Sequence, residues 1–110
     1  MAKPPVTEDP HHFVLVTFDL HDAKDSQRKR IHKAIIAEGL DKKLVKRNRE
    51  TVPAPANTFS GLIPVATWPD PVELKKHLKA RIKKAIRKED LKAVLVVAVS
   101  AEYSWTVANV

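Results

Sequence analysis

A single carboxylate follows the first apolar segment of the chain, in the sequence FDLHD. Asp19 comes directly after residues 13–18, which read FVLVTF, and a carboxylate at the end of a central strand is well placed to reach a cleft. Two such carboxylates related by a two-fold axis can hold one hard cation, Mg²⁺ or Mn²⁺, because hard cations prefer oxygen ligands. His21 is the nearest group able to act as acid or base. The alternative for Asp19 is a solvated carboxylate that opens a loop.

The other polar groups near this position have ordinary structural explanations. Asp22 and Asp25 can assist a metal, but such residues before a helix are more often caps. The five histidines show neither the HxxxH nor the HExxH spacing of paired metal ligands, and His11 and His12 are expected in a loop. No serine has the His and Asp pattern that acyl transfer needs, and no phosphate loop or dinucleotide fingerprint is present. An ATP- or NAD-dependent enzyme is therefore disfavoured.

Basic residues dominate the charge of the chain. Twenty Lys and Arg face 13 Asp and Glu, which gives a net charge of +7 over 110 residues. An excess of this size attracts phosphate backbones, although lysines also serve simply to keep helices soluble. Lys46, Arg47 and Arg49 lie together on a short polar segment that cannot be core, and Arg28 lies on the first helix. We predict nucleic-acid contact, with RNA or DNA, at these four residues, and a solvated face for the many cations of the second helix.

The first half of the chain predicts a buried strand, a helix and a polar strand. Residues 13–18 are apolar and β-branched, with only Thr17 interrupting the run, which is typical of a strand buried on both faces. A helix capped by Asp25 or Ser26 follows and ends at Gly39. Residues 43–52, KLVKRNRETV, indicate one polar edge strand.

The second half repeats this order. Residues 57–65, NTFSGLIPV, indicate a strand that pairs with 43–52 as a hairpin. Asp70-Pro71-Val72-Glu73 predicts the start of a helix that runs to about residue 88, because aspartate caps and proline suits the first turn. Residues 93–99 are a second fully apolar strand, and 103–107 are a candidate for one more.

The resulting order is βαββαβ, which predicts an α+β, ferredoxin-like domain with an antiparallel sheet and both helices on one face. We expect residues 1–12 to be a flexible tail and 13–110 to form the single domain. Because the strands at 13–18 and 93–99 are apolar on both sides, the second face of the sheet needs cover. A homodimer packed sheet against sheet is the simplest cover.

The composition also bears on the compartment. No apolar run approaches the roughly 20 residues of a membrane span, and the start of the chain lacks the apolar stretch of a signal peptide. The chain has no cysteine, which fits a reducing environment. We expect a cytoplasmic protein without a membrane partner.

The segment FVLVTFDLHD, the basic helix with Arg28 and Arg30, and Gly39-Leu40 after it together resemble a known family. They are similar to the opening of the small CRISPR-associated nucleases of the spacer-acquisition complex, and to relatives of the VapD toxin and the GhoS-type antitoxin. The resemblance implies a ferredoxin-like fold, a sheet-packed dimer and, in several members, a metal-dependent nuclease, with Asp19 at the matching position. The chain lacks the usual serine before the phenylalanine of the third strand, where Thr58 and Phe59 stand.

Two functional hypotheses follow from the residues and the resemblance together. One is a nucleic-acid-binding protein that acts as a Mg²⁺- or Mn²⁺-dependent endonuclease on RNA or DNA, with Asp19 as the metal ligand and His21 as the proton carrier. The other is a non-catalytic binding or toxin–antitoxin regulatory module of a phage or plasmid. A subunit-interaction protein whose charge only keeps it soluble is a third, plainer alternative.

Overall fold

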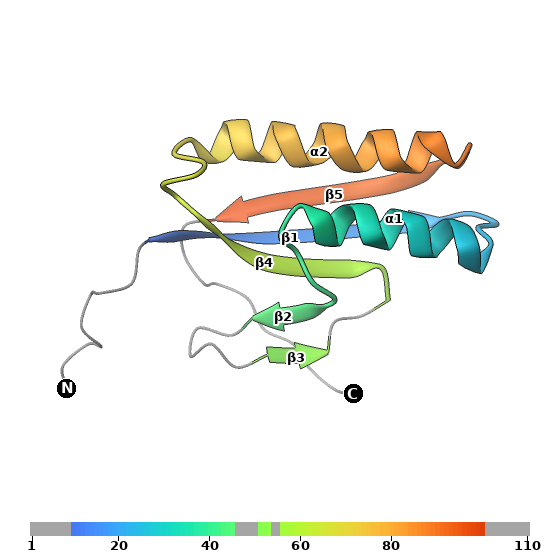
Figure 1. Ribbon diagram of the computed structural model, residues 1–110, viewed down its shortest axis with the longest axis horizontal. Coiled ribbons are helices and arrows are strands. Elements are labelled where there is room, and N and C mark those ends of the chain that lie inside the picture. The colour runs from blue at the N-terminus through green and yellow to red at the C-terminus, as the bar shows by residue number, and fades with distance from the viewer. Residues whose placement is uncertain (1–9, 46–50, 54–55, 101–110) are drawn as a thin grey trace.

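The computed structural model describes residues 10–45, 51–53 and 56–100 and shows an α+β arrangement (Figure 1). β1 lies in the middle of a three-stranded antiparallel sheet, between β4 and β5, while β2 and β3 pair in a separate two-stranded sheet. Two helices complete the described part. The elements are β1 (His11–Leu20), α1 (Asp25–Ala37), β2 (Lys43–Val45), β3 (Thr51–Pro53), β4 (Thr58–Pro64), α2 (Pro71–Lys88) and β5 (Ala93–Ser100).

The central strand is longer than the sequence predicts. β1 pairs with β4 from His11 onward and with β5 as far as Leu20. His11 and His12, expected in a loop at the end of a tail, are therefore strand residues, and Asp19 lies within the strand instead of after it. Both neighbours supply backbone partners beyond the apolar run, and these extend the strand into polar residues. The rest of the expected tail, residues 1–9, lies outside the described residues.

One face of the sheet carries the core. Alternate residues of β1 point to this face, because side chains alternate along a strand, and they are buried in one cluster with residues from both helices. The two helices therefore cover the same face of the sheet, as predicted. The members of this cluster from β1 are Val14, Val16, Phe18 and Leu20, and those from the helices are Ile31, Ile35, Leu74, Leu78, Ile82 and Ile86.

The opposite face of the sheet is open along β5. The odd-numbered residues of β5 are half-buried and the even-numbered residues are exposed. Val94 and Val96 remain 67% and 52% exposed, although both are β-branched and apolar. They pair across the strands with Asp19 and Thr17 of β1. The two-sided apolar character read from the sequence of β5 thus leaves valines exposed on the face without helices, which we call the helix-free face.

The start of α1 differs from the prediction. The N-cap is Lys24, and not Asp25 or Ser26. Gln27, the third residue of the helix, accepts a hydrogen bond from the Lys24 backbone N–H through its side-chain oxygen at 2.9 Å. The Lys24 backbone N–H thus gains a hydrogen-bond partner from the first turn of α1, and the helix starts one residue earlier than a cap at Asp25 predicts. The end is as predicted: α1 stops at Ala37, and Gly39 takes a φ of 96°, which favours glycine.

Residues 43–52 do not form one strand. β2 and β3 are three residues each, and they pair with each other in the register Leu44 to Val52. Beside β4 the chain instead presents Asp41, whose N–H donates to the Ser60 carbonyl at 2.8 Å and whose carbonyl accepts from the Ser60 N–H at 2.9 Å. This bridge occupies the edge of β4 before β2 begins, and β2 pairs antiparallel with β3 in a separate sheet. Residues 46–50 lie outside the described part.

The second helix matches the prediction closely. The Asp70 side chain accepts a hydrogen bond from the Val72 N–H at 2.8 Å, and Pro71 occupies the first turn. α2 runs to Lys88 and buries Leu74, Leu78, Ile82 and Ile86 at intervals of four. The candidate strand at 103–107 lies outside the described residues.

Gly61 on β4 gives a test of this packing. A Cβ at position 61 would lie 2.7 Å from the Gly39 carbonyl oxygen and 2.9 Å from Cδ2 of Leu40. Because Leu40 is buried and the oxygen belongs to the backbone, the contact cannot relax easily. We expect Gly61→Ala to lower the free energy of unfolding by about 1–3 kcal/mol, measured by urea denaturation. An unchanged midpoint would show that the α1–β2 connection does not press on β4 as described.

Candidate functional site

Asp19 lies on the helix-free face of the sheet. It is exposed and pairs with Val94 of β5. Among the described residues its carboxylate forms no hydrogen bond or ion pair. The neighbouring side chain on the same face, Thr17, lies 3.1 Å from the Thr58 hydroxyl, oxygen to oxygen. Among the described residues, Asp19 is therefore an unpaired carboxylate beside the exposed valines of β5.

His21 lies beyond the end of β1 and is exposed. Asp22 follows with a φ of 54°, so the chain turns sharply at this point. No hydrogen bond joins His21 to Asp19 in the described part of the molecule. The structure thus places the two predicted catalytic groups at the same end of β1 without linking them.

The described residues of one chain do not form a cluster of metal ligands around Asp19. In residues 10–45, 51–53 and 56–100, no group of three or more His, Cys, Asp or Glu side chains could hold a metal ion. Mg²⁺ and Mn²⁺ take about six oxygens and are usually held through one or two carboxylates together with water or substrate oxygens. Asp19 can supply one such carboxylate, and the site predicted from the sequence takes its second from Asp19 of another copy of the chain.

The predicted nucleic-acid residues are described only in part. Arg28 lies on α1 with its side chain 41% exposed, and it forms an ion pair with Asp25 at 3.2 Å. Asp25, considered as a cap or metal ligand, is thus engaged by the next turn of its own helix. Lys46, Arg47 and Arg49 fall outside the described residues.

The exposed flank of α2 beside β5 carries a second set of cations, for which the sequence predicted only a solvated face. Four of them recur at intervals of four residues, are exposed, and form no ion pair within the described part. By contrast, Lys76 lies 3.8 Å from Glu73 and Arg81 lies 3.4 Å from Glu38. The four-residue spacing of these cations is visible in the sequence and could have identified them as one set. We call this set the α2 row; it consists of Lys75, Lys79, Lys83 and Arg87.

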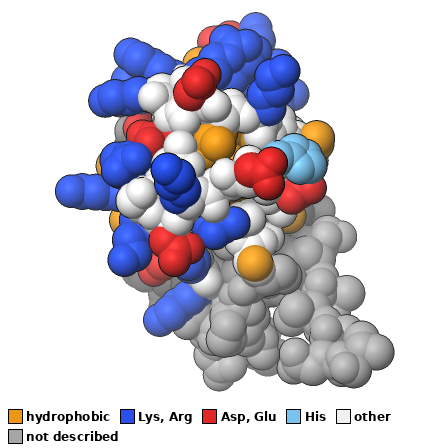
Figure 2. Space-filling model, turned by 90° about the vertical axis from the view of Figure 1, so that its right-hand side faces the viewer, with side chains coloured by type: hydrophobic (Ala, Val, Ile, Leu, Met, Phe, Trp, Pro, Cys, Tyr) orange, Lys and Arg blue, Asp and Glu red, His pale blue; other side chains and the backbone are white. Residues whose placement is uncertain are grey.

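The α2 row belongs to a broader basic surface. Figure 2 views the end of the molecule at which α2 finishes, and lysine and arginine side chains crowd its upper part. Acidic side chains are interspersed among them, in the upper part as well as lower on this end, and further lysine and arginine side chains lie lower down. The arrangement can attract an anionic ligand along the helix.

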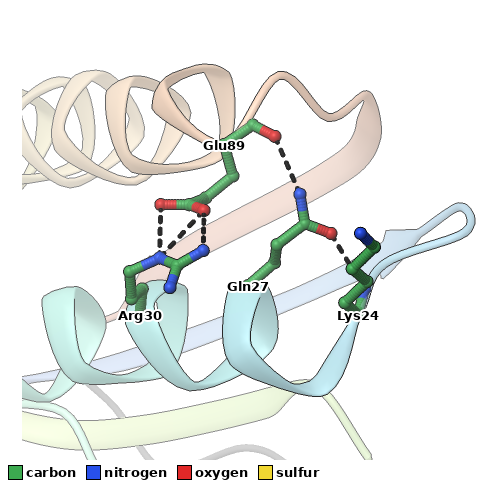
Figure 3. Close-up of polar contacts among 4 residues, drawn as sticks. All are labelled: Lys24, Gln27, Arg30 and Glu89. Atoms are coloured by element: carbon green, nitrogen blue, oxygen red, sulfur yellow. Dashed lines mark hydrogen bonds and ion pairs between the residues drawn. The ribbon is translucent and has the colours of Figure 1, made fainter.

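A bidentate ion pair fixes the end of α2 against the start of α1 (Figure 3). Nε of Arg30 lies 2.9 Å from each carboxylate oxygen of Glu89, and Nη2 lies 2.6 Å from Oε1. The guanidinium holds the pKa of the Glu89 carboxyl below its usual value, and the hydrogen bonds raise the pKa of Arg30. The Gln27 side chain also donates to the Glu89 carbonyl at 3.1 Å. Glu89 is therefore already engaged and does not neutralise the α2 row.

His32 is a structural residue in this arrangement. Its ring packs edge-on against Phe59, with centroids 5.1 Å apart, and against Phe18 at 6.1 Å. Burial lowers the pKa of His32 most strongly. The hydrogen bond to Asn57 Oδ1 opposes this shift, and the charges of Lys42 and Arg28 add to it. The lowered pKa favours the neutral imidazole form of this half-buried side chain at neutral pH.

Two further histidines also make structural contacts. His12 is buried, and its Nε2 donates to the Trp68 carbonyl at 2.7 Å. His77 packs against the Trp68 ring and lies 2.7 Å from a Glu38 oxygen through Nε2. These contacts give His12 and His77 structural roles.

Comparison of the chain with protein-family models and with curated proteins gave no match. Within the described residues, neither helix has the length and apolar character needed to cross a membrane.

The lowered pKa of His32 predicts a specific loss of stability in acid. The unfolded chain binds this proton more readily than the folded chain, so the contribution of His32 is complete above about pH 6.5 and declines as the pH falls below that value. We expect the free energy of unfolding to fall more between about pH 7.5 and about pH 5.5 in the wild type than in His32→Gln, by at most about 1.4 kcal/mol per pH unit. Urea denaturation at the two pH values measures this difference. Parallel decreases in the two proteins would contradict the assignment.

Proposed function

We propose that this protein binds nucleic acid through the exposed flank of α2 beside β5. The observation that supports the proposal is the α2 row, four exposed cations without acidic partners in the described part. A set of lysines that only solubilised the helix would gain by pairing with acids on adjacent turns. Here Glu73 and Glu38 pair with other residues, and the row remains available.

The spacing of the α2 row suits a phosphate backbone. Residues four apart on an α-helix are separated by about 6 Å along its axis. One strand of duplex DNA carries a phosphate about every 3.4 Å of its axis, so successive cations of the row can approach alternate phosphates. Contacts of this kind are tolerant of sequence. Lys46, Arg47, Arg49 and Arg28 are proposed as further contacts on the same ligand.

We also make a proposal about the arrangement of the strands. We propose a ferredoxin-like βαββαβ domain in which β2 stands for the second strand, next to β4. The Asp41–Ser60 bridge supports this placement, because it puts the chain leading into β2 at the edge of β4. We further propose that the protein acts in the cytoplasm.

Charge removal along α2 tests nucleic-acid binding. Replacing all four residues of the α2 row by Gln should weaken binding to a labelled oligonucleotide. It should also flatten the salt dependence, because each cation that no longer meets a phosphate lowers the log–log slope by up to about 0.9. Fluorescence anisotropy at several salt concentrations measures both quantities.

The matched control removes the same charge elsewhere. Lys29, Lys33, Lys42 and Lys43 are exposed cations of α1 and the segment after it, and their replacement by Gln should reduce affinity much less. Equal reductions in the two variants would show that only net charge matters. No binding by the wild type at low salt would remove the proposed function altogether.

A separate observation supports a second candidate function that depends on a dimer. Val94 and Val96 are exposed apolar residues on the helix-free face, and the unpaired carboxylate of Asp19 lies beside them. We propose that two copies pack through this face. Such packing brings two Asp19 carboxylates toward a two-fold axis, where like charges repel unless a proton or a cation intervenes. A divalent cation held there would neutralise phosphate charge and allow phosphodiester cleavage, with His21 as the nearest proton carrier.

Asp19→Asn tests this second candidate by two measurements. The substitution removes the repulsion with little change of shape, so the variant should dimerise at least as well as the wild type and lose any strengthening by Mg²⁺ in sedimentation experiments. Metal-dependent cleavage of RNA or DNA, if present in the wild type, should disappear. A monomeric wild type would contradict the packing through the helix-free face. A dimer that cleaves no substrate would favour the non-catalytic binding or regulatory module.

A further inference from the structure

A cavity of about 410 Å³ lies between the C-terminal half of α2 and β5. Its rim and its floor differ in chemistry. The rim carries four cations, and the floor is formed by aliphatic side chains of Ile86, Leu91, Ala93 and Leu95. Ile86 is buried and the other three are half-buried, so the floor continues the core to the surface. The cations are Lys79, Lys83, Arg87 and Lys92.

The rim cations have no acidic partner among the described residues. The nearest carboxylate in sequence with a defined contact, Glu89, is bound by Arg30 on the side of α1. Asp90 is exposed, and its backbone N–H closes the turn after α2 by donating to the Arg87 carbonyl at 2.9 Å. The four positive charges therefore surround an apolar surface, and no carboxylate among the described residues pairs with them.

The aliphatic floor and the cationic rim of the cavity favour a ligand that has both an apolar part and an anionic part. An apolar body gains by leaving water for an aliphatic floor, and an anionic head gains from the cations at the rim. Arg87 adds a planar fork that matches a carboxylate or a phosphate. The volume falls in the range of small-molecule sites, about 300–1,000 Å³.

We propose that this cavity binds a small amphiphilic anion, an organic carboxylate or phosphate monoester with an aliphatic body. An inorganic anion would leave the floor unused, and an uncharged amphiphile would leave the rim unsatisfied. The site shares Lys79, Lys83 and Arg87 with the α2 row. The aliphatic floor is used by an amphiphilic ligand and not by a phosphate backbone, so the two proposals can fail separately.

Three kinds of ligand separate the contributions. Octanoate and octyl phosphate carry both parts, octanol carries only the apolar part, and inorganic sulfate carries only the charge. Each is titrated into the ¹⁵N-labelled protein, and amide shifts of residues 79–95 are followed by NMR. We expect saturable shifts with one or both of the amphiphilic anions, and at least tenfold weaker binding of octanol and sulfate. The comparison of octanoate with octyl phosphate distinguishes the two head groups.

Two double variants of α2 provide matched charge removal. Lys83→Gln with Arg87→Gln removes two rim cations, whereas Lys84→Gln with Lys88→Gln removes two cations of the same helix that do not line the cavity. The first pair should weaken binding of the better amphiphilic anion by roughly fivefold, the size expected for two exposed charge contacts. The second pair should leave it within experimental error.

A substitution that fills the floor of the cavity tests the apolar part of the site without changing its charge. Ala93→Leu adds aliphatic volume into the cavity without altering charge, and it should abolish binding of the amphiphilic anions while unfolding midpoints confirm the fold. Sulfate binding as tight as that of octyl phosphate would overturn the proposal, as would equal reductions in the two double variants. Failure of both amphiphilic anions to bind would overturn it as well.

Discussion

The amphipathic character of α2 is the constraint on which the other features depend. Its buried residues recur every fourth position from Leu74 to Ile86, and each is almost fully removed from water. Burial of such side chains contributes about 1.5–3 kcal/mol each before the entropy of ordering is considered. This stripe fixes the rotation of the helix on the sheet. Once the rotation is fixed, the row one position further along, beginning at Lys75, lies about 100° around the helix from the buried stripe, on the flank beside β5.

The central strand and one ion pair complete the arrangement. β1 supplies alternate buried residues beneath both helices, so α1 and α2 share one core. Arg30 and Glu89 then join the first turns of α1 to the end of α2 at the surface. Exposed ion pairs contribute little unless their geometry is favourable, as it is in a bidentate pair. Here the pair also engages the carboxylate that would otherwise offset the cations near the end of α2.

The parts of the fold that sequence predicts well are those decided locally. Asp70 and Pro71 define the start of α2 because a cap needs only its own turn. By contrast, the residues from 43 to 52 and the position of Asp19 depend on pairing with distant strands. Asp41 takes the place beside Ser60, and β5 extends β1 past Asp19. The cations of α2 were visible in the sequence, but their availability depends on which acids the fold brings to them, and the cavity depends on the approach of β5.

The most direct test of the account is to locate the nucleic-acid contact on the protein. Amide shifts followed by NMR during titration with a short oligonucleotide provide this location. We expect the largest changes along the flank of α2 beside β5, at and around Lys75, Lys79 and Lys83, while Val94 and Val96 on the helix-free face change little. Changes confined to the helix-free face, with α2 unaffected, would contradict it.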